Sequence, residues 1–303
     1  MAVDIQALLE AVLAAGSNGP RHEPLWGVAD SPDVVAALQE IRRNGPGRLR
    51  AVALDALVYL AGPPALDRRD REAIERLIGI RQRSDPVGAV MSCWTYWWCV
   101  RSDEQDPVIA SLGLVDVSSV TYNLAYSLVD ILEHCDREAG IVYVGPAMNG
   151  WIPIVGHRCD AFGERRADVQ ATLERLSDEY GEAHAFYFGA QGDGSAWLVA
   201  RSGATVRRYS SVDPGQSSGD PLPMEQHWLD ENGVPGRPED HLTVEDEYTD
   251  AMWEFPEAND VAAEISVDVG WKHPTDAAPH GVPLLARLPG TAATPLPPGA
   301  YEI

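Results

Sequence analysis

The chain has 303 residues and a formal net charge of −23 at pH 7, because 46 Asp and Glu residues outnumber 23 Lys and Arg residues. A field of this sign repels DNA, RNA and anionic lipid, so we expect neither nucleic acid nor a membrane as a partner. It attracts cationic peptides and proteins, although an acidic surface also serves simply to keep a cytoplasmic protein soluble. The length and a hydrophobic fraction of 45% predict a globular protein with two domains, at about 150 residues each.

The N-terminus and the cysteines indicate the compartment. Residues 1–16 contain Asp4 and Glu10 and no basic side chain, unlike a secretory signal, and no apolar stretch approaches the ~20 residues of a membrane span. The cysteines lack the paired spacing of zinc fingers and redox motifs; they are Cys93, Cys99, Cys135 and Cys159. We therefore expect a cytoplasmic protein with reduced thiols, and we predict no metal and no cofactor.

The first hundred residues carry a helical pattern. Apolar side chains recur at intervals of three and four in the segments 5–13, 34–41, 49–60 and 74–78. Ser31 before Pro32, and Asp67 before the last of these segments, are typical N-caps. The pattern predicts a helical domain over residues 1–105. Within it, residues 49–78 resemble a HEAT or armadillo-type helical unit, while a plain helical domain without a repeat explains the spacing equally.

An aromatic run, SCWTYWWCV, occupies residues 92–100. We expect a helix here, on which Trp94, Trp97 and Trp98 share one face. Such a face either packs into a core that joins the two domains or lines a pocket. The three tryptophans are therefore candidate binding residues, with packing as the more general interpretation.

From Ile141 onward the apolar pattern changes to the alternation of strands. The segments 141–144 and 151–155 flank Asn149-Gly150, a strong hairpin signal, and Pro153 predicts that the second strand lies at a sheet edge or a bulge. A helix is predicted over residues 166–180, and further strands over 184–188, 196–201 and 205–210. This order predicts an antiparallel sheet covered by at least one helix, so the fold class is α+β.

The predicted sheet domain covers residues 106–303. Beyond Ser210 the chain becomes acidic and rich in Pro and Gly and loses its period, with short helices predicted near residues 224–231 and 260–267. The last stretch, up to Tyr301, is expected to wrap the surface or to fray.

The segment FYFGAQGDGSAWLVARSG, residues 186–203, sets three glycines in six residues between apolar runs. Gly189 and Gly194 have the spacing of a phosphate-binding loop, but Ser and Ala follow where Lys and Ser/Thr belong. A dinucleotide fingerprint, a nucleophile elbow and a calcium loop also fail, because Asp193 and Trp197 stand where glycines or ligands are required. The composition is that of a turn between two strands, with enough polar side chains left over to bind a ligand.

Candidate site residues lie in and around this loop. The candidate catalytic side chains are Asp193, Tyr187, Arg207 and His157, since acid–base chemistry needs only one or two such groups in a shaped cavity. The candidate binding residues of this region are Gln191, Ser195, Trp197 and Tyr209. Arg207 either grips a carboxylate of a ligand or pairs with a carboxylate of the protein itself.

A short loop after the 151–155 strand contains His157, Cys159 and Asp160. These residue types can supply part of a metal site, but no second cluster with finger spacing accompanies them. The sequence therefore favours no metal, and it leaves open whether this loop binds one.

Two segments, GWIPIVG (150–156) and FYFGAQGDGSAWLVA (186–200), resemble a group of actinobacterial proteins. In that group a G-W-x-x-x-V-G strand precedes a G-A-Q-G-D-G-S-A-W loop. The resemblance covers the middle part of the chain and implies no activity. The acidic α+β character is also loosely similar to bacterial toxin-immunity proteins of the SUKH type, which implies an immunity-like or accessory role.

Charge, aromatic run and loop together predict a binding protein for a peptide or protein partner, expected to be cationic, held at the junction of the two domains. The alternative is a metal- and nucleotide-independent enzyme, of the cyclase, lyase or isomerase type, acting on a peptide or natural product near residues 189–195. A third interpretation is a scaffold whose helical half does all of the binding. A closed pocket with a perturbed carboxylate or histidine favours the enzyme, and a wide groove favours the binding protein.

Overall fold

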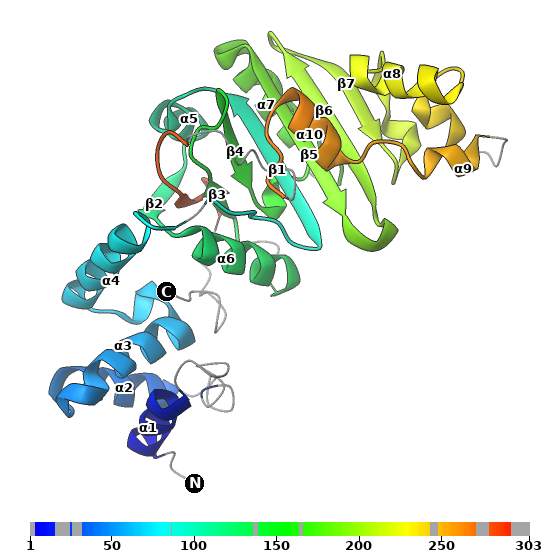
Figure 1. Cartoon of the computed structure of the whole chain (residues 1–303). Helices are drawn as coiled ribbons and strands as arrows, with labels where there is room; N and C mark the ends of the chain where they lie inside the picture. Colours follow the sequence, from blue (N-terminus) through cyan, green and yellow to red (C-terminus); the bar gives the residue numbers. More distant parts are fainter. Residues whose placement is uncertain are drawn as a thin grey trace. The chain divides into compact units, whose positions relative to one another are not determined.

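The computed structural model describes residues 4–15, 25, 32–85, 87–135, 139–163, 166–242, 248–270 and 279–291. The chain divides into two units, a helical unit of Met1–Asp85 with Ala293–Ile303 and a sheet unit of Pro86–Ala292 (Figure 1). The division comes before the boundary at residue 105 that the sequence suggests.

The helical unit contains the four helices that the sequence predicts. They are α1 (Ile5–Ala15), α2 (Pro32–Asn44), α3 (Gly47–Ala61) and α4 (Arg68–Arg81), with the 3₁₀ turn η2 (Pro63–Ala65) before α4. Asp67 caps α4 as expected, because its side chain accepts a hydrogen bond of 2.9 Å from the backbone N–H of Asp70. The carboxylate of Asp70 in turn pairs with Arg42 at 2.7 Å, which ties α4 to α2.

The sheet unit is built on one antiparallel sheet, in which nine strands of the described chain follow the order β2-β9-β3-β4-β1-β5-β6-β7-β8. The strands are β1 (Trp94–Arg101), β2 (Val115–Ser119), β3 (Ile141–Val144), β4 (Trp151–Val155), β5 (Glu182–Gly189), β6 (Gly194–Arg201), β7 (Ala204–Ser210), β8 (Ser218–Gly219) and β9 (Leu284–Arg287). The α+β class and the antiparallel sheet are thus confirmed. The hairpin turn at Asn149-Gly150 is also present, with Met148 bridged to Trp151.

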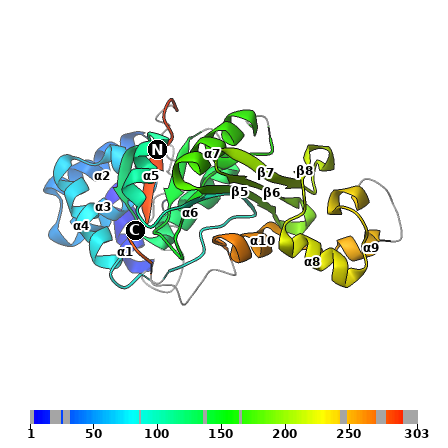
Figure 2. The ribbon, with the colours of Figure 1, turned by 90° about the horizontal axis from the view of Figure 1, so that it is seen from above.

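Helices cover both faces of this sheet. α7 (Arg166–Tyr180) lies across one face and α10 (Ala258–Ile265) across the other, as both ribbon views show (Figures 1 and 2). The remaining helices are α5 (Gln105–Leu112), α6 (Tyr122–Cys135), α8 (Pro223–Asn232) and α9 (Thr249–Met252). The 3₁₀ turns of this unit are η3 (His157–Cys159), η4 (Ala190–Gly192), η5 (Pro214–Gln216) and η6 (Pro238–His241). None of the described helices is long and apolar enough to cross a membrane.

The central strand β1 feeds a core on each face. Trp98 and Val100 join the buried cluster under α7, which includes Leu173 and Leu176. Trp97 points to the opposite face, where its Nε1 donates a hydrogen bond of 3.3 Å to the carbonyl of Val267. Both faces of β1 are therefore buried, as expected for a strand in the middle of a covered sheet.

The expectation of a helix for the aromatic run is wrong. Residues 94–101 form β1, which pairs with β4 on one side and β5 on the other. Aromatic and β-branched side chains favour strands, and burial on both faces removes the alternation that would have marked one. Trp94 and Trp98 consequently lie on one side of the sheet, and Trp97 on the other.

Two further expectations are corrected. Pro153 does not mark an edge strand, because β4 lies between β3 and β1. Its carbonyl accepts a hydrogen bond from the N–H of Gly145, and the carbonyl of Gly145 accepts one of 2.8 Å from Nε2 of Gln105, so the missing N–H of Pro153 is replaced by a side chain. The late stretch is not all surface wrapping, since β9 inserts between β2 and β3.

Candidate functional site

The glycine-rich segment is a tight connection between β5 and β6. Gln191, Gly192 and Gly194 all have positive φ, and a Cβ on Gly194 would lie 2.6 Å from a methyl of Val212. Hydrogen bonds fix the loop at both ends. The N–H of Ala190 donates to the carbonyl of Cys93 at 2.8 Å, and the N–H of Ser195 donates to Oγ of Ser211 at 2.8 Å. A larger residue at position 194 would clash with Val212 and would be strained at positive φ. Glycine is therefore required there, and it fixes the backbone conformation next to Asp193.

Asp193 is the exposed acidic tip of this loop. Its Oδ2 accepts a hydrogen bond of 2.5 Å from Nε1 of Trp94, at the start of β1. The hydroxyl of Tyr187 donates to the carbonyl of Asp193 at 3.3 Å. The structure thus brings together three residues that the sequence singles out, although Trp94 lies more than ninety residues earlier in the chain.

The loop forms one wall of a groove with a volume of about 560 Å³. The sheet contributes Ser195 and Tyr209, and the segment around α9 contributes Trp253, Phe255 and Glu257. No Lys or Arg is among the described residues that line it, whereas Asp193 and Glu257 are. Both carboxylates are exposed. The groove therefore joins an apolar aromatic surface to negative charge.

Stacked rings form the floor of the groove. The rings of Trp197 and Tyr209 stack with centroids 4.1 Å apart, and Phe255 lies 5.5 Å from Tyr209. Trp197 is fully buried, and its Nε1 donates a hydrogen bond of 2.5 Å to Glu225 of α8. Of the sequence-predicted binding residues, Tyr209 thus lines the groove, whereas Trp197 stacks on it and does not line the groove.

Arg207 lies below this floor and is 1% exposed. Its guanidinium pairs with Glu225 at 3.0 Å and with Glu239 of η6 at 2.9 Å, and it lies 5.6 Å from the ring of Tyr209. Of the two roles the sequence leaves open, the geometry is that of an internal ion pair. Arg207 connects the sheet to the segment that carries η6.

Burial dominates the electrostatics of this cluster. It raises the pKa of Glu225 to about 6, against the opposing effects of Arg207 and of the hydrogen bond from Trp197. Burial alone would lower the pKa of Arg207, but the hydrogen bond to Glu239 and the charge of Glu225 outweigh it, so that pKa is raised. Arg207 is therefore the fixed charge of the cluster, and Glu225 is the group whose protonation changes near neutral pH.

A second cluster lies where β1 begins and where β4 and β5 end, beside the loop. Nδ1 of His157 lies 3.2 Å from Oε2 of Glu133, which is 2% exposed. The ring of Tyr96 contacts His157 edge-on at 5.0 Å and stacks on Tyr187 at 4.7 Å. His157 is thus oriented by a buried carboxylate, the arrangement that general bases share.

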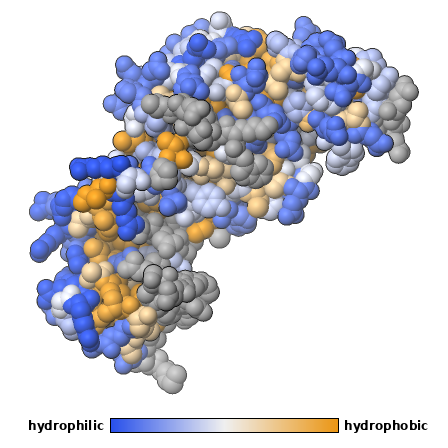
Figure 3. All heavy atoms as spheres, in the orientation of Figure 1, coloured by the Kyte–Doolittle hydropathy of each residue, from blue (hydrophilic) through white to orange (hydrophobic). Residues whose placement is uncertain are grey.

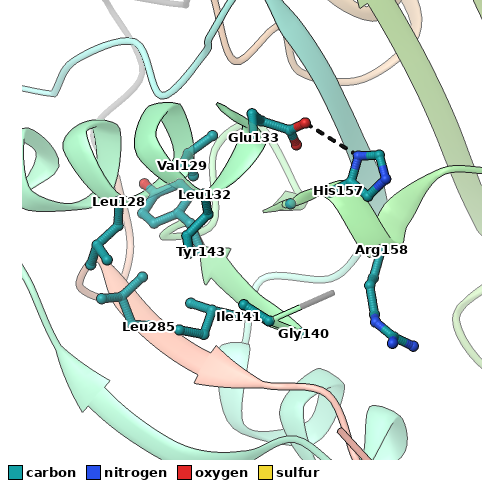
Figure 4. A pocket seen from close by; sticks show the side chains of 12 residues that line it. Leu128, Val129, Leu132, Glu133, Gly140, Ile141, Tyr143, His157, Arg158 and Leu285 are labelled. Atoms are coloured by element: carbon teal, nitrogen blue, oxygen red, sulfur yellow. Dashed lines mark hydrogen bonds and ion pairs between the residues drawn. The ribbon is translucent and has the colours of Figure 1, made fainter. Parts of the chain in front are cut away.

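Figure 4 shows the small pocket that adjoins this pair. Leu128, Leu132, Tyr143 and Leu285 line its apolar side, with Glu133 and His157 at its polar end. Its volume is about 20 Å³, enough for one water molecule and too small for a substrate.

The remaining sequence candidates lie elsewhere. Gln191 is exposed on the loop, and Ser195 lines the groove with its Oγ accepting from the N–H of Ala258. Trp97 and Trp98 are both buried in the sheet core, where the Nε1 of Trp98 donates to the carbonyl of Cys159. These two tryptophans pack and do not reach the groove.

Sequence reasoning missed Glu133, Trp253 and Glu257. Glu133 lies on α6, a helix in a segment to which the sequence assigned no element. Trp253 and Glu257 lie in a stretch that has neither helical nor strand periodicity. The only sequence signal there is a large aromatic residue among acidic ones. That these three residues lie near the glycine loop is visible only in the folded structure.

The loop with His157, Cys159 and Asp160 does not converge on a metal. Cys159 is fully buried, and its burial raises the pKa of its thiol well above the ordinary value. The side chain of Asp160 accepts from the N–H groups of Phe162 and Gly163 at 2.7 and 2.9 Å. The described residues contain no group of three or more His, Cys, Asp or Glu side chains arranged to hold a metal ion.

No family model matches the chain, and the comparisons with curated proteins and with solved structures find no match either.

Proposed function

We propose that the protein binds a cationic peptide segment of a partner protein in the groove beside residues 189–195, and that it does so in the cytoplasm. One observation carries the proposal: the groove combines aromatic surface with the carboxylates of Asp193 and Glu257 and contains no Lys or Arg among its described lining residues. Its volume of about 560 Å³ lies within the range of pockets that bind ligands of small-molecule size.

The surroundings of the groove support a cationic occupant. The sequence of residues 239–260, which supplies Leu242, Trp253 and Glu257 to the groove, contains nine Asp or Glu residues and no Lys or Arg. On the visible face in Figure 3, the end of the sheet unit at α8 and α9 is covered mainly by hydrophilic residues. A concentrated negative field speeds the approach of a basic segment and repels acidic ones.

The helical unit has a supporting role in this proposal. Its α2 and α3 pack against each other as a helical hairpin, the unit from which HEAT-like repeats are built. The HEAT-like character that we propose for this unit comes from the sequence of residues 49–78, which contribute to α3, η2 and α4. We propose with it an accessory function in partner binding, of the kind found in immunity or maturation proteins.

The test is a titration of the full-length protein with a labelled basic peptide and with an acidic peptide of equal length. We expect the basic peptide to bind, with affinity falling about tenfold or more between about 50 and about 500 mM NaCl. The double variant Asp193→Asn/Glu257→Gln should weaken binding and flatten its salt dependence. Glu264→Gln, an exposed carboxylate of the same unit outside the groove, is the matched control. Equal binding of both peptides contradicts the proposal.

The His157–Glu133 pair favours a second candidate function. A half-buried imidazole oriented by a buried carboxylate, beside Tyr96 and Tyr187, can accept and donate a proton without metal or nucleotide. The candidate is a cyclase, lyase or isomerase acting on a peptide or natural product.

Mass spectrometry and chromatography of peptides incubated with the protein test this candidate. A product that forms with the wild type and with His134→Gln, but not with His157→Gln, supports catalysis. His134 is the matched control because it is exposed and adjoins Glu133 on α6. Peptides recovered unchanged contradict it.

A further inference from the structure

The side chain of Trp253 is the most exposed large apolar group of the described chain, at 82%. By contrast Trp97, Trp98, Trp151 and Trp197 are at most 5% exposed. Trp253 also lines the groove. An indole left in water at the edge of a groove is typical of a binding hot spot, because its large face gains most when a partner covers it.

Within the described part of the chain, the two carboxylates that share the groove with Trp253 have no cationic partner. Neither Asp193 nor Glu257 forms an ion pair with a described residue. Oδ2 of Asp193 accepts a hydrogen bond from the indole N–H of Trp94. Within the described chain, its other oxygen, Oδ1, accepts no hydrogen bond. Two exposed carboxylates and an open indole face thus line the same groove.

We infer that the groove selects an arginine side chain of its partner, with the guanidinium stacked on Trp253 and donating to Asp193 and Glu257. This inference rests on the proposed function and specifies its ligand. A guanidinium is planar and weakly hydrated, so it stacks on an indole and forms paired hydrogen bonds with carboxylates at once. Lysine carries a compact, strongly hydrated charge that satisfies the carboxylates but uses the indole face less well.

The experiment compares three peptides that differ at one central residue: arginine, lysine or citrulline. Citrulline keeps the shape of arginine and removes its charge. We expect the arginine peptide to bind about tenfold or more tightly than the citrulline peptide, and several-fold more tightly than the lysine peptide. Binding is measured by isothermal titration calorimetry on the full-length protein.

Variants then locate the contact. Trp253→Ala should weaken arginine-peptide binding about tenfold and reduce the preference for arginine over lysine, while Trp253→Phe should retain part of both. Tyr126→Ala is the matched control, because Tyr126 is an exposed aromatic residue of the same unit, at 45%, and does not line the groove. Since Trp253 is exposed, its loss should leave the circular dichroism spectrum and the unfolding transition unchanged.

The outcomes separate this inference from the proposal beneath it. If arginine and citrulline peptides bind equally, or if Trp253→Ala retains the arginine preference, the arginine site is overturned while peptide binding stands. If neither arginine nor lysine peptides bind, both fall. If the lysine peptide binds as tightly as the arginine peptide, the groove binds basic segments but does not select the guanidinium.

Discussion

The interiors of the two units differ in kind. The helical unit buries aliphatic side chains such as Leu57, and its buried carboxylate Asp70 is satisfied by one partly exposed arginine. The sheet unit buries Arg207, Glu225 and His184 among stacked aromatic rings, and burial lowers the pKa of His184 to about 3. One interior is simple packing, while the other holds charged groups that cost free energy to desolvate.

The surfaces differ in the same direction. The helical unit contains 11 Lys and Arg residues and 13 Asp and Glu residues, whereas the sheet unit contains 12 and 33. Nearly all of the net charge of −23 therefore belongs to the sheet unit, which also supplies every described residue that lines the groove. The groove and most of the acidic residues thus belong to the same unit, which supports the proposal that the groove binds a cationic partner.

The largest expected effect tests whether the units are separate. A chain that begins at Pro86 should unfold cooperatively in urea, because it contains the whole sheet unit. A chain that begins at Asp106 lacks β1, which pairs with both β4 and β5, and should lose essentially all of the ~5–15 kcal/mol of a stable domain. Tryptophan fluorescence follows the transition. A cooperative transition in the shorter chain would show that β1 is dispensable.

The buried ion cluster is the next test. Arg207→Met leaves Glu225 and Glu239 without their cation, so we expect the free energy of unfolding to fall by about 3–5 kcal/mol in urea titrations. Arg201→Met, which removes a half-exposed partner of Glu182, should cost less than about 1 kcal/mol. Similar losses for the two variants would mean that the charges in the sheet interior are no more costly than those at its surface.

Glu225 predicts that the stability of the sheet unit depends on pH. Its pKa in the folded protein is about 6, above its ordinary value of 4.5, so the folded state binds this proton more tightly than the unfolded state. Its contribution to stability is therefore greatest below about pH 4.5 and falls by about 2 kcal/mol in total as the pH rises through about 6. Urea titrations of the wild type and of Glu225→Gln measure the difference. Parallel pH profiles would contradict the assignment.

The smallest effect concerns the helical unit. Asp70→Asn weakens the bridge to Arg42 but keeps the shape of the side chain, so we expect a loss of about 1–2 kcal/mol in unfolding followed by helical circular dichroism. Glu10→Gln, in an exposed pair with Arg48, should change stability by less than about 0.5 kcal/mol. A loss for Asp70→Asn as large as that for Arg207→Met would erase the difference between the two interiors.

Elements with local signals were predictable from the sequence. The cap at Asp67, the turn at Asn149-Gly150 and the helix over residues 166–180 depend on side chains within a few positions of one another. The glycine loop was likewise identified as a turn, because the ability of Gly194 to adopt positive φ follows from its residue type and needs no distant partner. Short-range physics suffices for such features.

Features that depend on distant partners were not predictable. Trp94–Arg101 is a strand because β4 and β5 flank it, and burial on both faces hides the alternation by which a strand is recognised. The same holds for β9, four residues whose strand character comes from β2 and β3. Trp253 and Glu257 became site residues only when the fold brought them to the glycine loop.

The hydrogen bond between Trp94 and Asp193 allows binding in the groove to be followed by the fluorescence of Trp94 and by the NMR signal of its indole proton. The indole N–H of Trp94 is bonded to a carboxylate that faces the groove, so a cation arriving at Asp193 changes the electron density at that N–H. Indole protons resonate apart from most amide signals, and indole emission responds to nearby charge. Occupancy of the groove by an unlabelled ligand is thus readable from Trp94, a residue that does not itself line it.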